Sequence, residues 1–150
     1  IRPATDTKQL LGWNALMITA LCKAYMALGN EKYISMAETV VKSVETYFAQ
    51  PKQPYLYHTH TNGEAKIDAF VDDYAYLIQA YLYLQEATGK NTYLKNVEVL
   101  IYLVTDFFSD EHQKFFYFSQ QHSNIVVRKK EIYDAATPSG NAIMAMNLYK

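Results

Sequence analysis

The 150-residue sequence contains a single cysteine, only five glycines and no excess of charge of either sign. Cys22 alone excludes an internal disulfide and any Cys-x-x-Cys redox or zinc motif. A formal net charge of −1 offers no electrostatic attraction to nucleic acid or to an anionic membrane. No apolar run approaches the roughly 20 residues of a membrane-spanning helix. We therefore expect no nucleic-acid partner and no membrane partner.

Sequence signals for cofactors, metals and export are also missing. The chain has no glycine-rich phosphate loop, and Ser139 lacks the Gly-x-Ser-x-Gly setting of a serine nucleophile. His58 and His60 share one face of a predicted strand, but no third metal ligand follows at a suitable spacing. The sequence begins with Ile1 and shows no signal peptide. We expect no cofactor, no metal site and a cytoplasmic protein, and we interpret the chain as a piece of a longer one.

Hydrophobic residues, by contrast, make up half of the sequence, and tyrosine occurs fourteen times. Apolar residues recur at helical spacing, and glycine ends two of the segments. The pattern predicts helices over Trp13–Leu28, Lys32–Ala49, Asp73–Ala87 and Tyr93–Phe108, with a fifth starting near Pro138. Aromatic clusters bounded by turn residues predict short strands at Tyr55–His58 and Phe115–Phe118.

These segments form a repeat of sixty residues. The aligned pairs include Ala15 with Ala75, Ile18 with Ile78, Gly29 with Gly89 and Phe48 with Phe108. A third copy begins at Asn141. Helix hairpins of this size bury their apolar faces only by stacking on one another. The predicted fold class is therefore all-α, with stacked antiparallel helix hairpins that form an arc of an (α/α) toroid and short aromatic strands between the hairpins. Residues 1–150 are expected to be a partial toroid domain of about two and a half hairpins.

Asp72 and Asp73 open the third predicted helix. Adjacent helical residues point about 100° apart, so the two carboxylates cannot face each other as a catalytic pair. In a structural interpretation Asp72 caps the helix and Asp73 stabilises its positive end. In a functional one Asp73 is a general acid or base at the mouth of the toroid. Trp13 occupies the position of Asp73 in the preceding repeat, which argues against a generic cap.

The starts of the first, third and fifth helices are expected to meet at one rim. A tryptophan beside tyrosines and carboxylates is typical of a sugar pocket, so we expect a carbohydrate ligand. The candidate catalytic residues are Asp73 and Asp134, and the candidate substrate-binding residues are Trp13, Asn14, Tyr74, Ser139 and Asn141. The structural alternatives remain open: Trp13 packs between hairpins, Asn14 caps a helix, and Asp134 caps the fifth helix.

The order of several short motifs resembles one known family. These motifs are Arg2-Pro3, Asp6-Thr7-Lys8, Gly12-Trp13-Asn14-Ala15-Leu16-Met17-Ile18, Asp73-Tyr74-Ala75, and Asp134 followed by Pro138-Ser139-Gly140-Asn141. They resemble the thioredoxin-domain-containing family of bacterial YyaL and the mammalian spermatogenesis-associated proteins. Thr7, Gly12 and Ala15 stand where that family has Asp, Ser and Gly.

The resemblance implies a toroid similar to those of the six-hairpin glycosidases and the N-acylglucosamine 2-epimerases. In the family the toroid follows an N-terminal thioredoxin-like domain, which this sequence does not contain. Two functions remain open. One is a carbohydrate-active or carbohydrate-binding toroid, and the other is a non-catalytic scaffold that presents the thioredoxin-like domain to client proteins.

An arc of a ring exposes hairpin faces that the complete ring would bury. We therefore predict that the chain self-associates when it is produced alone. Light scattering measures this directly, and a monodisperse monomer would contradict the prediction.

Overall fold

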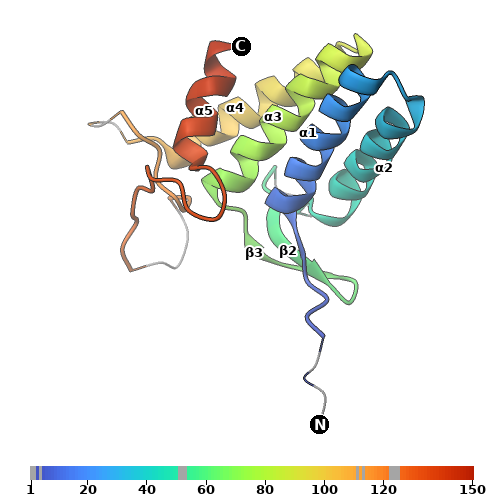
Figure 1. Ribbon diagram of the computed structural model, residues 1–150. Helices are drawn as coiled ribbons and strands as arrows, with labels where there is room; N and C mark the ends of the chain where they lie inside the picture. The colour runs from blue at the N-terminus through green and yellow to red at the C-terminus, as the bar shows by residue number, and fades with distance from the viewer. Residues whose placement is uncertain (1–2, 4, 51–53, 111, 113, 122–125) are drawn as a thin grey trace.

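The computed structural model describes residues 3, 5–50, 54–110, 112, 114–121 and 126–150. Its helices are α1 (Leu11–Leu28), α2 (Glu31–Tyr47), α3 (Val71–Thr88), α4 (Thr92–Phe108) and α5 (Gly140–Tyr149). Three strands form a small antiparallel sheet in the order β1 (Gln9–Leu10), β2 (Tyr57–Thr61) and β3 (Glu64–Asp68). Figure 1 shows α1, α3 and α5 side by side, with their N-terminal ends on the side of the β2–β3 hairpin.

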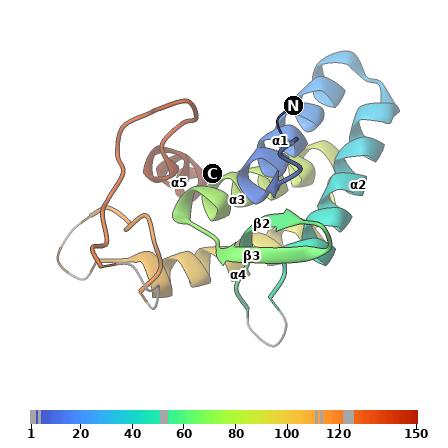
Figure 2. The ribbon, with the colours of Figure 1, turned by 90° about the horizontal axis from the view of Figure 1, so that it is seen from below.

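The helices form two layers. Viewed along the helices in Figure 2, α1, α3 and α5 make one row, while α2 and α4 lie outside it. Helix α3 is central because it packs against α1, α4 and α5. Its buried residues Tyr74, Leu77, Ile78 and Leu84 are at most 2% exposed and form the middle of the core. This arrangement confirms the predicted stacked hairpins.

The sixty-residue repeat is confirmed in detail. Helix α3 begins and ends sixty residues after α1. Gly29 and Gly89 end these helices in the left-handed conformation, with φ of 65° and 70°, and their N–H groups donate to Tyr25 and Gln85. A left-handed end favours glycine because other residues meet a steric cost there.

The predicted strands are only partly correct. Strand β2 is present but is shifted along the chain toward Thr61. A tight turn at Asn62 and Gly63 joins it to its antiparallel partner β3, a strand that the sequence did not predict. Phe115–Phe118 forms no strand. Tyr117 N–H donates to Phe108 O, as Tyr57 does to Phe48 O, but Phe116 N–H is bound by a side chain instead of a second strand.

Helix α1 is long and apolar enough, by length and composition alone, to cross a membrane. In the structure Leu11, Ala15, Ile18 and Cys22 of this helix are completely buried against the neighbouring elements. Packing between α2 and α3 accounts for these apolar residues, whereas Trp13, Met17, Met26 and Leu28 of the same helix are exposed. Cys22 is buried, as a small hydrophobic residue would be.

Two glycines allow the inner helices to approach one another. A Cβ added to Gly140 would lie 2.9 Å from the Cα of Asp72 and would collide with its carboxylate. A Cβ added to Gly12 would lie 2.9 Å from Asp73 Oδ1. Both contacts are closer than real Cβ atoms reach, so any side chain at Gly140 forces α5 away from α3.

We predict that Gly140→Ala lowers the free energy of unfolding by about 1–3 kcal/mol, because overpacking displaces α5. Helix propensity alone predicts that this substitution raises the free energy of unfolding, since alanine is favoured over glycine in a helix by up to about 1 kcal/mol. Chemical denaturation measures the difference, with Ala142→Gly on the exposed side of α5 as the control for propensity. A Gly140→Ala variant at least as stable as the wild type would contradict the close packing.

Candidate functional site

The starts of three inner helices are joined by two neighbouring carboxylates. Asp73 Oδ1 accepts a hydrogen bond of 2.9 Å from Gly12 N–H at the start of α1. Asp72 Oδ1 accepts one of 3.0 Å from Gly140 N–H at the start of α5. Helix N-termini favour negative charge because their first N–H groups have no partner within the helix. The two aspartates therefore link α3 to both of its neighbours in the inner row, α1 and α5.

Asp73 is a buried carboxylate with hydrogen bonds at both oxygens. Its side chain is 3% exposed. Besides Gly12, it accepts hydrogen bonds at Oδ2 from Phe70 N–H at 2.9 Å and from His58 Nδ1 at 2.8 Å. The bond to Phe70, the residue before α3, fixes the first turn of the helix. Asp73 therefore holds Gly12, His58 and Phe70 in fixed positions around it.

Asp72 differs from Asp73 although it is adjacent in the chain. It is half-buried, and the structure shows one backbone donor to it, Gly140. Burial raises the pKa of Asp72 to about 6, and the nearby charges of Asp73 and Glu131 act in the same direction, while the hydrogen bond from Gly140 opposes them. Asp72 is thus a group that titrates close to neutral pH. It is not the helix cap, since Phe70 holds that position.

His58 of strand β2 also contacts Asp73. Its ring lies edge-on to Phe70, with the centroids 5.0 Å apart, and its side chain is 26% exposed. The hydrogen bond to Asp73 raises the pKa of His58 above its ordinary value, while burial opposes the rise. The sequence showed His58 only as a strand histidine, because its partner Asp73 is fifteen residues away and on another element.

A cavity of about 90 Å³ lies between these groups. It is lined by Leu10, Gly12, Trp13, His58, Phe70, Asp72, Asp73, Tyr76, Phe118 and Thr137. Liquid water occupies about 30 Å³ per molecule, so the cavity has space for a few waters or one substituent of a ligand. Trp13 is 66% exposed at this cavity, which leaves its indole accessible from outside. We refer to the cavity and the exposed face of Trp13 as the rim site.

The structure places the other predicted residues of the first two repeats away from the cavity. The amide of Asn14 donates to the carbonyl oxygen of Leu10, the residue before α1, at 2.8 Å, so Asn14 does not cap the helix. Tyr74 is 1% exposed in the core, where its hydroxyl accepts a hydrogen bond from Leu56 N–H. Of the tyrosines at the start of α3, it is Tyr76 that lines the cavity, and its hydroxyl donates to Pro138 O.

The predicted residues near α5 form hydrogen bonds that fix the segment leading into that helix. Asp134 is exposed, and its Oδ1 accepts a hydrogen bond from Ser139 N–H at 2.8 Å. The Ser139 hydroxyl donates to Glu131 O. Asn141 accepts from Phe116 N–H and donates to the carbonyl oxygens of Phe116 and Glu131. None of these three side chains lines the cavity of the rim site.

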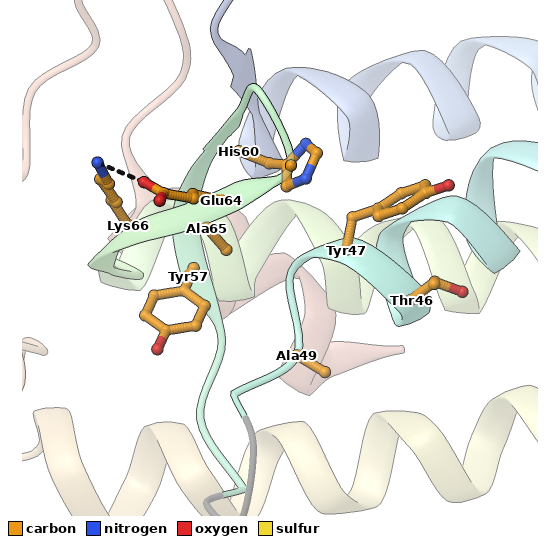
Figure 3. Close-up of a pocket in the computed structure, with 9 residues that line it drawn as sticks. Thr46, Tyr47, Ala49, Tyr57, His60, Glu64, Ala65 and Lys66 are labelled. Carbon is orange, nitrogen blue, oxygen red and sulfur yellow. Dashed lines mark ion pairs between the residues drawn. The ribbon is translucent and has the colours of Figure 1, made fainter.

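A larger and shallower hollow of about 450 Å³ lies beside the β2–β3 hairpin. Figure 3 shows His60 beside Tyr47 and the ion pair between Glu64 and Lys66 at the edge of the hollow. The ring centroids of His60 and Tyr47 are 5.0 Å apart. His60 and His58 therefore have different partners, and within the described residues no group of three His, Cys, Asp or Glu side chains is placed to hold a metal ion.

The fold and the convergence of helix starts define an arc of an (α/α) toroid. A family 105 glycoside hydrolase from C. acetobutylicum superposes with a TM-score of 0.73 at 15% identity, covering 94% of this chain and 41% of that chain. Cellobiose 2-epimerase from Bacillus thermoamylovorans gives a TM-score of 0.70 at 17% identity, covering 79% of this chain and 34% of that chain. At these identities the likeness establishes the fold.

The sequence relatives confirm the resemblance to the spermatogenesis-associated proteins. Spermatogenesis-associated protein 20 of Rattus norvegicus is 26% identical over 97% of this chain and 20% of its own length. An uncharacterised protein of Caenorhabditis elegans is 32% identical over 99% of this chain and 21% of its own length. The chain thus spans about a fifth of the length of the curated relatives it matches. No protein-family model matches it.

We predict that Asp72 titrates with a midpoint near pH 6 in the folded protein. A carboxyl group whose pKa rises on folding holds its proton more tightly in the folded state. Stability should therefore fall as the pH rises through the interval from about 4 to 6. Carboxyl carbon shifts measured by NMR give the midpoint. Asp72→Asn keeps an oxygen acceptor for Gly140 and should remove this part of the pH dependence, whereas Asp106→Asn on the exposed side of α4 should not.

Proposed function

We propose that this chain forms about two and a half hairpins of a carbohydrate-binding (α/α) toroid and that the rim site binds the sugar. The observation that carries the proposal is the convergence of an exposed indole, an imidazole and a titratable carboxylate at the joined starts of α1 and α3. Carboxylate and imidazole groups hydrogen-bond hydroxyls, and an aromatic face packs against the C–H groups of a sugar ring. Ligand sites typically combine a few convergent polar groups with apolar and aromatic walls in this way.

The size of the cavity determines how a sugar would be held. Pockets for small molecules usually measure about 300–1,000 Å³, several times the volume of this cavity. In the proposed complex the sugar ring therefore rests on Trp13 outside the cavity, and one hydroxyl enters between His58 and Asp72. The exposed face of Trp13 leaves room for this arrangement.

The solved structures with the same fold support this proposal by analogy. Their names identify one as a glycoside hydrolase and another as a cellobiose 2-epimerase. Fold alone does not transfer an activity, since one architecture serves many functions. The proposal therefore depends on the side chains of the rim site.

We predict saturable sugar binding with a dissociation constant of roughly millimolar, as expected for a small polar ligand on an open site. Trp13 is the single tryptophan, so its indole N–H gives one NMR signal that reports on the site. Titration with glucose, mannose and cellobiose should shift this signal together with the amides of Gly12 and Gly140.

Asp73→Asn should abolish the binding, because an amide cannot accept all three hydrogen bonds that the carboxylate accepts. Trp13→Ala should weaken it by removing the stacking face. Asp106→Asn is the matched control on the outer helix and should bind as the wild type does. Absence of any shift with all three sugars would refute the proposed function.

A further inference from the structure

The contacts of Asp73 determine which ring nitrogen of His58 carries a proton. Asp73 already accepts hydrogen bonds from two backbone N–H groups, those of Gly12 and Phe70. Backbone N–H groups only donate, so the carboxylate is held as an acceptor. The 2.8 Å contact with His58 Nδ1 is therefore an N–H donated by the histidine. In the neutral ring the other nitrogen, Nε2, then carries the lone pair.

The backbone opposite His58 is strained. The pairs Tyr57–Asp68 and Thr59–Lys66 place Ile67 across the hairpin from His58. Ile67 has φ of 63°, in the left-handed region that a β-branched side chain rarely adopts. Strain of this kind persists where surrounding contacts impose it, and it concentrates at functional sites. In this hairpin, the bond to Asp73 and the packing on Phe70 hold His58 in place.

The titratable groups around His58 all belong to one helix. Asp73 and Asp72 of α3 both interact with its charge. Helix α1 contributes Gly12 and Trp13 to the cavity, and the segment before α5 contributes Phe118 and Thr137, none of which is charged. The charge state of His58 is thus set by the two aspartates and by its own burial.

We propose that His58 is the proton-transferring residue of the rim site, acting through Nε2, and that Asp73 is its positioning residue. This inference rests on the proposed function. Nε2 takes the proton of a bound sugar hydroxyl: the new N–H bond forms as the O–H bond breaks, and the electron pair stays on the sugar oxygen. The Asp73 carboxylate offsets the charge of the imidazolium, and the same proton returns to the sugar in the reverse step. Aspartate–histidine pairs serve this purpose in serine hydrolases.

This assignment gives His58 the role of general acid or base that the sequence analysis offered for Asp73. A general acid or base needs a free acceptor or a proton to give, and it must reach the substrate. Asp73 is buried and its oxygens are occupied by three donors. His58 lines the cavity and keeps one ring nitrogen outside its bond to Asp73. Histidine also changes charge near neutral pH, as proton transfer requires.

The test is the protonation state of His58 measured by imidazole ¹⁵N NMR on the labelled chain. We expect the neutral ring to carry its proton on Nδ1, with a pKa above the ordinary value of about 6.5. Asp73→Asn should lower this pKa and abolish the Nδ1–H preference, which a purely structural role for Asp73 would not require. His60→Gln removes the neighbouring histidine of β2, which packs on Tyr47, and should leave the His58 signals unchanged.

Titration with the same sugars then separates the two proposals. A sugar-dependent shift of His58 Nε2, together with the Trp13 indole, supports the inference. A shift of the indole without any change at Nε2, or a neutral ring with its proton on Nε2, overturns it while the proposed function stands. If His58 shows the Nδ1–H form and no sugar shifts any signal, the proposed function fails and the inference fails with it. His58→Asn keeps an N–H for Asp73 and identifies the His58 signals by their loss.

Discussion

The packing of the inner helices α1, α3 and α5 depends on two hydrogen bonds. They are accepted by two adjacent residues of α3, Asp72 and Asp73, and they point to opposite neighbours. Because neighbouring side chains on a helix point about 100° apart, Asp73 turns toward α1 and Asp72 toward α5. Each carboxylate accepts an N–H that the neighbouring helix leaves unpaired at its start. Each also lies where the neighbour has a glycine, Gly12 or Gly140, since a Cβ at either position would collide. The side-by-side order of α1, α3 and α5 in Figure 1 follows from these contacts.

The same geometry gives the two aspartates different chemistry. Three donors surround Asp73 and fix the orientation of its carboxylate. One backbone donor reaches Asp72, and burial without comparable compensation raises its pKa to about 6. Burial raises the pKa of a carboxyl group unless hydrogen bonds stabilise its charged form, which accounts for the raised pKa of Asp72. The site therefore combines one carboxylate that orients His58 with one whose pKa is raised to about 6.

The helices could be predicted from the sequence because apolar spacing and terminal glycines are local signals. Strand β3 was not predicted, although Glu64–Asp68 alternates charged and apolar residues, because the run is short and Ile67 is its only strand-favouring residue. Its pairing with β2 defines it. The candidate site was predicted in part: Trp13 and Asp73 line the cavity, whereas Tyr74 is in the core and Asn141 anchors the loop. His58 was missed as a partner of Asp73 because that contact joins a strand to a helix. Of the Arg2-Pro3 motif, Arg2 lies outside the described residues.

The two sequence repeats share their helix positions but differ in the residues of the first helical turn. Helices α1 and α3 begin and end sixty residues apart, so their first turns occupy equivalent positions in successive hairpins. At those positions α1 has Gly12 and Trp13, whereas α3 has Asp72 and Asp73. A glycine in one repeat admits the carboxylate of the next, and a tryptophan that makes no such bond remains exposed. The repeat thus supplies the scaffold, and the substitutions in its first turn bring an aromatic face beside an aspartate–histidine pair.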